Sequence, residues 1–420
     1  MIKRIAAPLM LVALFAFSAL MRVEHVEAQF PVGFGAQRAP AIISDSTGKL
    51  YLMMSVATNT AEARTPGSQI FFTMSKNGGN SWDNEPVTRN LSNSDGEAFG
   101  PSAAVTRGLG PRPYVAYHDN SDGITQVYLL RNKKKAKFKK PKNITPHNGG
   151  AFTPRLAIDP NNGLNIVWGD NSRLRREVAF VRSTDEGGTF TDLKILSQSS
   201  GNAFDPEIAI VPLSESPVGF SINVVWDDTD PGHSVIMFSR SLDGGETFTP
   251  PMVVSRTTGD ANEANIAVDE QGGIHVVWID TSTGDPEAFY ARSSDGGGSF
   301  SEPVNVSNVS NGEVRKPVIA AAGNKVFIAF NEDDNSAQVF LVTSSNGGQT
   351  FSDRVRVSNA NRNIGRAHSA SIAIDPDGTL HIVWIDSSLI GRDEGLLFYG
   401  RTTNGEEIGS KKMILAFVGQ

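Results

Sequence analysis

The sequence predicts an all-β protein that forms a β-propeller of seven four-stranded blades, with six blades as the alternative. Three observations lead to this prediction. An eight-residue turn motif occurs five times, a unit of 52 to 61 residues can be aligned seven times, and each unit holds four short strand patterns separated by turn residues. A chain of 420 residues is long enough for two or three ordinary domains, but a closed ring accommodates all the units in one.

The first 28 residues have the pattern of a secretory signal peptide. Lys3 and Arg4 precede an apolar run from Ile5 to Met21, and Val26-Glu27-Ala28 resembles a cleavage site. Because the run is close to spanning length, a retained N-terminal anchor is the alternative. We therefore expect residues 29–420 to form one β-propeller domain that is secreted or periplasmic, with no membrane span after signal removal.

The seven units begin at Pro40, Pro101, Pro154, Pro206, Ala264, Pro317 and Ala370. In the best-formed unit, strands are expected at 265–269, 273–280, 288–293 and 303–307. The first strands are continuous apolar runs, which suits the inside of the ring, whereas the fourth alternates and suits an outer edge facing water. Each blade is contiguous in the chain, so the ring closes either by apposition of its ends or by a strand added from Phe30 to Arg38.

The recurring turn connects the third and fourth strands of a unit. Its best copy is Ser241–Phe248, and its third position is Asn77, Asp185, Asp243, Asp295 or Asn346. An Asp or Asn side chain there can accept hydrogen bonds from backbone N–H groups, the glycines supply positive φ, and the closing Phe or Trp packs under the turn. We interpret these turns as structural.

Two units depart from the motif. The seventh has Thr402–Glu406 without the second glycine, followed by a possible last strand in Lys411–Val418. The second replaces the turn with the basic stretch Arg131–Lys140, which is either a solvated loop or a contact to an anionic glycan or surface.

Composition excludes several classes of function. The chain has a formal net charge of -7 and no basic stripe across the repeats, which argues against a nucleic-acid partner. It has no cysteine, and hence no disulfide, thiolate metal site or cysteine nucleophile. We expect a monomer without a cofactor, with Ca²⁺ as the one possible exception.

Candidate site residues gather on the face opposite the recurring turns. The second strands end in Asp119, Asp170, Asp227, Asp280 and Asp386, with Asn331 in the sixth unit. These carboxylates either cap turns or form a binding rim around the channel, able to hold Ca²⁺ or sugar hydroxyls. The sequence has no loop of recognised metal-ligand spacing, so it does not specify a metal site.

Residues that break the repeat are further candidates on this face. They are Arg38, Arg155, Arg315, Arg366 and His368, all near the start of a first strand. The arginines either grip a carboxylate together or are separate exposed charges.

The turn resembles the Asp-box (BNR) repeat, S-x-D-x-G-x-T-[FW], of the sialidase-like β-propeller superfamily. The resemblance implies an arginine clamp for a substrate carboxylate, a tyrosine nucleophile assisted by a glutamate, and an aspartate acid/base in the first blade. Arg38-Ala39-Pro40 resembles the N-terminal Arg-Ile-Pro of sialidases. However, 47–82 contains no aspartate, no tyrosine falls in a loop leading to a first strand, and sialidases have six blades rather than seven.

The sequence therefore predicts a secreted module that binds a glycan or an exported protein, or serves as a scaffold, and that is not an enzyme. The alternative is a glycoside hydrolase, an exo-α-sialidase type of exo-glycosidase. In that alternative Arg38, Arg315 and Arg366 would clamp the substrate, and Glu62 would replace the missing acid.

Overall fold

The computed structural model describes residues 34–414 except 59–66, 84–88, 109, 135–136, 147–148, 215, 231, 310–311, 334–336, 359–365, 388–394 and 410. Side chains are also left out at 34–39, 57–58 and 133–134. The predicted signal peptide and Glu62 lie outside the described residues. Within this part of the chain, no helix has the length and hydropathy to span a membrane.

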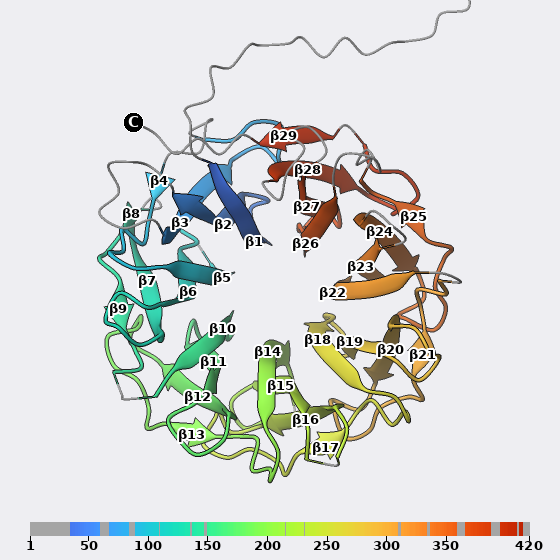
Figure 1. Ribbon diagram of the computed structural model, residues 1–420, viewed down its shortest axis with the longest axis horizontal. Coiled ribbons are helices and arrows are strands. Elements are labelled where there is room, and N and C mark those ends of the chain that lie inside the picture. Colours follow the sequence, from blue (N-terminus) through green and yellow to red (C-terminus); the bar gives the residue numbers. More distant parts are fainter. Residues whose placement is uncertain are drawn as a thin grey trace, which may run out of the picture. The chain divides into compact units, whose positions relative to one another are not determined.

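Seven antiparallel sheets form a ring, which confirms the predicted seven-bladed β-propeller (Figure 1). Blade 1 contains β1 (Phe34–Ser44), β2 (Leu50–Thr58), β3 (Gly67–Ser75) and β4 (Arg89–Asn90). Blade 2 contains β5 (Ala98–Val105), β6 (Pro113–Asp119), β7 (Gln126–Lys134), β8 (Lys137–Phe138) and β9 (Lys142–Asn143). Blade 3 contains β10 (Ala151–Ile158), β11 (Leu164–Asp170), β12 (Glu177–Ser183) and β13 (Lys194–Ile195).

Blade 4 contains β14 (Ala203–Pro212), β15 (Phe220–Asp228), β16 (Val235–Ser241) and β17 (Met252–Val253). Blade 5 contains β18 (Ala261–Val268), β19 (Ile274–Asp280), β20 (Glu287–Ser293) and β21 (Val304–Asn305). Blade 6 contains β22 (Glu313–Ala322), β23 (Lys325–Asp333), β24 (Ala337–Ser344) and β25 (Val355–Arg356). Blade 7 contains β26 (Ala367–Ile374), β27 (Leu380–Asp386), β28 (Leu396–Thr402) and β29 (Lys412–Ile414).

Strands pair in chain order from the inside of the ring outward. The second strands are almost completely buried because each is covered on both faces by neighbouring blades, which explains their continuous apolar sequences. Blade 2 differs, because β7 pairs with β8 in addition to β9. The basic stretch of the sequence thus forms a small extra hairpin.

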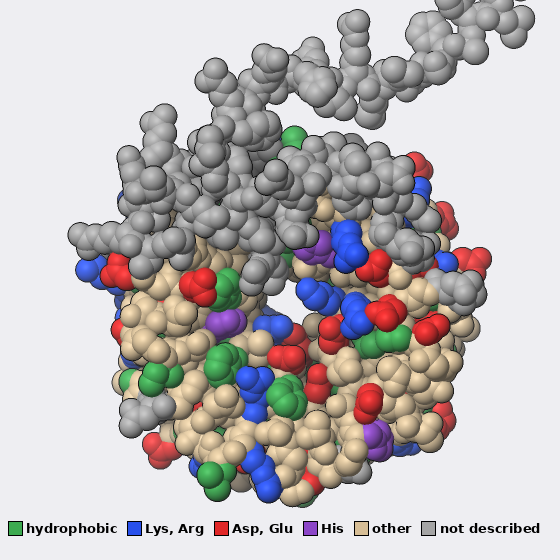
Figure 2. All heavy atoms as spheres, in the orientation of Figure 1, with side chains coloured by type: hydrophobic (Ala, Val, Ile, Leu, Met, Phe, Trp, Pro, Cys, Tyr) green, Lys and Arg blue, Asp and Glu red, His purple; other side chains and the backbone are tan. Residues whose placement is uncertain are grey.

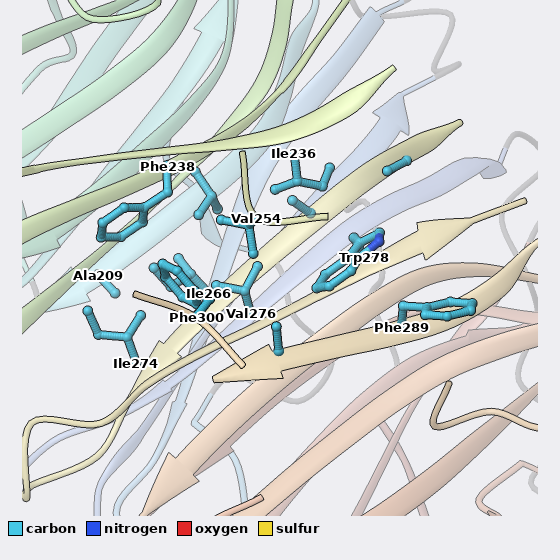
Figure 3. Packing of buried hydrophobic residues seen from close by; sticks show 14 of the residues in the cluster. Ala209, Ile236, Phe238, Val254, Ile266, Ile274, Val276, Trp278, Phe289 and Phe300 are labelled. Carbon is cyan, nitrogen blue, oxygen red and sulfur yellow. The ribbon is translucent and has the colours of Figure 1, made fainter. Parts of the chain in front are cut away.

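The hydrophobic core is divided into layers between adjacent blades. Figure 3 shows one such layer, in which Phe238 and Val254 of blade 4 pack against Ile274, Trp278 and Phe300 of blade 5. The corresponding layer between blades 7 and 1 contains residues from both ends of the chain. Each blade is therefore stabilised mainly by its two neighbours.

In the part of the chain that the structure describes, the ring closes by apposition of blades 1 and 7, without a shared strand. At this seam the Ile42 N–H donates to Ser371 Oγ at 3.3 Å, and Arg401 Nη1 donates to the Gly78 carbonyl at 2.9 Å. Of the segment 30–38, which was the alternative for closure, residues 34–38 are described, and they extend β1 rather than add a strand.

The recurring turns follow the third strands and join blades as well as cap them. In Ser241–Phe248, the Thr247 N–H donates to Asp243 Oδ1 at 2.9 Å and the Gly245 N–H donates to Ser241 Oγ at 2.8 Å. The closing aromatic ring reaches the third strand of the preceding blade in four edge-to-face pairs: Phe248 with Phe180, Phe300 with Phe238, Phe351 with Tyr290, and Trp82 with Tyr399. Each of these turns therefore stabilises a joint between blades.

Candidate binding site at the mouth of the central channel

A β-bulge at the start of every first strand shapes the centre of the ring. In blade 3, Phe152 pairs with Gly169 and Arg155 with Val167, so the first strand carries one extra residue. The same shift occurs in all seven blades. We call the four residues of this segment bulge positions 1 to 4, so that Phe152, Thr153, Pro154 and Arg155 occupy them in blade 3.

In blades 2 to 7, bulge position 2 has a left-handed backbone. Its φ is 57° at Gly100, 46° at Thr153, 43° at Asp205, 54° at Glu263, 50° at Lys316 and 54° at Ser369. This conformation is unfavourable for residues other than glycine, and especially for a β-branched residue such as Thr153. Five blades follow it with proline, whose missing N–H removes a donor that an interrupted ladder would leave unpaired.

Bulge positions 2 and 4 line a central cavity of about 490 Å³, to which every blade contributes. Blades 3 to 6 supply the charged side chains, and blades 7, 1 and 2 supply mainly small or neutral ones. The charged lining residues are Arg155, Asp205, Glu207, Glu263 and Lys316. Among the described lining residues, one side of the channel is therefore ionic and the other nearly neutral.

An ion pair links the walls of blades 3 and 4. Arg155 Nε lies 2.5 Å from Glu207 Oε1, with side-chain exposures of 31% and 16%. Burial would lower the pKa of Arg155, but the charge and hydrogen bond of Glu207 outweigh it and raise that pKa. Burial raises the pKa of Glu207, although Arg155 opposes the shift. In blades 5 and 6, Glu263 Oε2 accepts a hydrogen bond from the Lys316 N–H at 2.6 Å.

Asp227 does not line the central cavity, but it stabilises the bulge of blade 5, which does. Its carboxylate accepts hydrogen bonds from the N–H groups of Glu263 at 3.0 Å and Ala264 at 3.5 Å, which holds the bulge of the next blade. Burial keeps the pKa of Asp227 well above its usual range, and the negative charge of Asp205 adds to the shift. Perturbed acids of this kind are common at functional sites.

Bulge position 1 surrounds the mouth of the channel. It is occupied in chain order by Arg38, Phe99, Phe152, Phe204, Asn262, Arg315 and His368. Three consecutive blades thus carry phenylalanine, and the remaining four carry polar or basic residues. Figure 2 shows hydrophobic and basic side chains beside the opening over blades 3 and 4, and basic and acidic side chains over blade 6.

The phenylalanines belong to a continuous row of planar groups. The His118 ring lies 5.8 Å from that of Phe99 and 6.5 Å from that of Phe152. The Arg176 guanidinium lies 4.9 Å from the centroid of Phe152 and 5.0 Å from that of Phe204. All three phenylalanines are partly exposed. The mouth therefore offers partly exposed aromatic rings along blades 2 to 4.

The aspartates predicted as a binding rim lie inside the blades. Asp119, Asp170 and Asp280 are at most 2% exposed, and each accepts a hydrogen bond at 2.8 Å from the N–H two residues later. Asp386 is also buried, and none of the described residues lining the central cavity belongs to the predicted rim. This geometry is that of a turn cap.

In two blades, the residue that the sequence analysis placed at the end of the second strand was wrong by one position. In blade 4 the cap is Asp228, which accepts hydrogen bonds from the Asp230 N–H at 2.9 Å and Trp226 Nε1 at 3.1 Å, and Asp227 faces the other way. In blade 6 the equivalent residue is Glu332 rather than Asn331, because Glu332 pairs with Val314 as Asp170 pairs with Ala151. Successive residues of a strand point to opposite faces, so one step changes the environment completely.

The repeat-breaking cations have separate surroundings. Arg315 is exposed and pairs with Glu313, while Arg366, 63% exposed, lies 3.5 Å from Asp333. Burial, together with the charges of Lys316 and Arg366, lowers the pKa of His368. Only the backbone of Arg38 is described, at the register position of Arg315. Of the four candidates whose side chains are described, Arg155 is the one that lines the cavity.

Neither the tyrosines nor the possible metal ligands among the described residues form a site of the kind that the resemblance or a bound metal would require. All six tyrosines are described, and none lines the central cavity. No group of three or more histidine, aspartate or glutamate side chains in this part of the chain is arranged to hold a metal ion.

Sequence reasoning overlooked Glu207, Glu263 and Lys316. The available signal was their position directly before or one residue after the recurring proline or alanine that begins each unit.

Several solved structures are similar to this fold. An ulvan lyase, a polysaccharide lyase bound to -[GlcA(1-4)Rha3S]-, has a TM-score of 0.56 at 11% identity, covering 90% of this chain and 96% of the lyase. A protein of unknown function from Dyadobacter fermentans has a TM-score of 0.52 at 14% identity, covering 89% and 95%. The intramolecular trans-sialidase from Ruminococcus gnavus has a TM-score of 0.49 at 12% identity, covering 89% and 96%.

No protein-family model matches the sequence, and no curated protein matches it significantly. At the identities of the structural matches, the similarity establishes the fold and leaves the activity to the site itself.

Proposed function

We propose that the protein is a secreted propeller that binds an anionic glycan at the mouth of its central channel without cleaving it. The observation that carries the proposal is bulge position 1, where Phe99, Phe152 and Phe204 form one side of the mouth and Arg315 and His368 lie on the other. This arrangement matches a ligand with apolar ring faces and negative substituents.

Each chemical feature of the mouth has a counterpart in such a glycan. The faces of sugar rings carry C–H groups that pack on aromatic rings, and their hydroxyls donate hydrogen bonds to carboxylates such as Asp205. Guanidinium groups bind carboxylates or sulfates, often through two hydrogen bonds. The acids deeper in the channel would repel negative substituents and so keep them at the basic part of the rim.

An exo-glycosidase of sialidase type is the second candidate. It is favoured by the raised pKa of Glu207 in the same cavity as Asp205 and Glu263, since glycosidases commonly use a pair of carboxyl groups. Two observations count against it. The carboxylate of Glu207 is engaged in an ion pair with Arg155, and none of the six tyrosines, all of them described, lines the cavity.

The proposal is tested by calorimetric titration of the chain from Gln29 with digalacturonate, a heparin disaccharide and neutral maltose. We expect the two anionic ligands to bind and maltose to bind at least about tenfold more weakly. The double variant Phe152→Ala, Phe204→Ala should lose affinity, whereas Leu193→Ala, at an exposed apolar residue of blade 3, should not. Equal binding of charged and neutral sugars, or no binding by folded protein, would contradict the proposal.

A separate assay addresses catalysis. Turnover of a fluorogenic sialoside that disappears in Arg315→Ala would contradict the binding function and support the exo-glycosidase. Absence of turnover in folded protein that binds the anionic disaccharides would support the binding function.

A further inference from the structure

A second basic site lies beside the aromatic row, in the loop between β11 and β12 of blade 3. This loop reads Asn171-Ser172-Arg173-Leu174-Arg175-Arg176 and borders a cavity of about 470 Å³. We call this cavity, lined by Arg173, Leu174, Arg175, Arg176 and Phe204 with two asparagines, the arginine pocket. It is separate from the central cavity.

The described residues that line the arginine pocket carry basic or neutral side chains. No aspartate or glutamate is among its described lining residues. Arg173 and Arg175 are exposed and have no ion-pair partner in the part of the chain that the structure describes. Leu174, between them, is fully exposed at 105%. A large apolar side chain with two unpaired guanidinium groups beside it is suited to covering by a ligand that is both anionic and partly apolar.

The base of the loop is held in place. The Arg176 N–H donates to Asn202 Oδ1 at 3.1 Å, and the Arg176 carbonyl accepts from the Ala203 N–H at 2.9 Å. Arg176 Nε also donates to Asn171 Oδ1 at 3.4 Å. The cationic side chains therefore project from a fixed base, which reduces the ordering cost of binding.

The arginine pocket is continuous with the mouth. Phe204 occupies bulge position 1 of blade 4 and also lines the arginine pocket. Arg176 lies against both Phe152 and Phe204, so the aromatic row ends in the arginine pocket. A ligand that lies along the row from the channel outward would reach it next.

We propose that the arginine pocket is a second anion subsite and that the ligand is an extended polyanionic polysaccharide, bearing carboxylate or sulfate groups on successive units. The inference rests on the proposed glycan-binding function and specifies its ligand. The chain of the polysaccharide crosses Phe204, with one negative group at the mouth and another between Arg173 and Arg175. A single terminal sugar would leave the arginine pocket empty.

The experiment compares ligand length. Calorimetric titrations use a disaccharide and an octasaccharide from each of two series, oligogalacturonate for carboxylates and heparin fragments for sulfates. In at least one series the octasaccharide should bind about tenfold or more tighter than the disaccharide, because the second contact is intramolecular. The double variant Arg173→Gln, Arg175→Gln should reduce octasaccharide affinity to that of the disaccharide and leave disaccharide affinity unchanged.

Arg107→Gln is the matched control, because Arg107 is an exposed arginine in the turn between β5 and β6, away from this loop. It should leave both affinities unchanged. Inorganic sulfate, titrated at constant ionic strength, distinguishes a simple anion site from a polysaccharide subsite.

The outcomes separate the two proposals. Disaccharides that bind as tightly as octasaccharides, or an octasaccharide affinity that survives the double variant, would overturn the second subsite and leave binding at the mouth intact. If sulfate binds and its binding is lost in the double variant, while saccharide affinity does not depend on length, the arginine pocket is a simple anion site. That result would contradict a polysaccharide as its ligand. Failure of every saccharide to bind would overturn the function proposed for the mouth itself.

Discussion

The seam between blades 1 and 7 is the part of the ring where a single side chain should control closure. Trp82 of blade 1 is 6% exposed, and its ring lies 5.4 Å from that of Tyr399 of blade 7 at an interplanar angle of 78°. The Tyr399 hydroxyl donates to the Gly78 carbonyl at 3.1 Å. None of the described strands crosses the seam, so these contacts and the layer of buried side chains stabilise it.

Trp82→Ala removes most of one such contact. Burial of roughly 200 Å² at about 25 cal/mol per Å² corresponds to about 5 kcal/mol, and large-to-small core substitutions of this kind cost about 3–5 kcal/mol. We therefore expect the free energy of unfolding to fall by about 4 kcal/mol. Chemical denaturation monitored by circular dichroism measures this loss.

Phe300→Ala is the matched control. Phe300 is 7% exposed, and its ring lies 5.0 Å from that of Phe238 at the joint between blades 4 and 5, where the chain connects the two blades. Both variants should lose similar global stability. Only Trp82→Ala should accelerate amide exchange on both sides of the seam, in β2 and β28, because a tethered joint closes again more readily. Equal exchange in β2 and β28 of the two variants would refute this account of closure.

Three further predictions concern the mouth. Burial and the charge of Arg155 lower the pKa of His118 to about 4, so stability should fall as the pH drops from 6.5 toward 4, by at most about 3 kcal/mol, and His118→Phe should flatten this slope in thermal melts. Burial raises the pKa of Asp227 in the folded state. Its stabilising contribution to folding is therefore fully present below the pKa of the unfolded chain, near 4, and is lost as the pH rises through the pKa of the folded state. Asp227→Asn should therefore be more stable than the parent chain at neutral pH, with the difference shrinking near pH 4 in urea titrations. Thr153→Gly should raise the free energy of unfolding, measured in urea, by about 1 kcal/mol, because glycine adopts a φ of 46° without strain. A lower free energy of unfolding would contradict the assignment of strain.

The repeat was predictable from the sequence because each strand and each turn has a characteristic pattern within a short stretch of residues. Strand patterns such as 273–280 and turns such as Ser241–Phe248 report their own conformation, and both lie where the pattern places them. Binding residues depend instead on which way a side chain points after a bulge. The bulge at Thr153 is invisible in hydrophobic alternation, since its extra residue is followed by an ordinary apolar strand.

The pair Asp227-Asp228 shows the same limit. Both residues are acidic and adjacent, and either fits a strand that ends in aspartate. The pairing of Ala203 with Asp228 assigns the cap to the second, and the hydrogen bonds to Glu263 and Ala264 give the first to the next blade. That assignment depends on a neighbour 36 residues away, which a single-blade alignment does not contain.

The bulge also explains how a structural repeat can carry an asymmetric site. Buried positions of a first strand, such as Leu156 and Ile266, belong to the layers between blades, so each is constrained by the neighbouring sheet. Bulge positions 2 and 4 face the cavity instead, and they tolerate threonine, aspartate, glutamate and lysine at equivalent sites. Binding chemistry can therefore change blade by blade without loss of the core. The aromatic row, the ionic wall of blades 3 to 6 and the arginine pocket are adjacent because they occupy consecutive blades, which favours one elongated ligand over several independent ones.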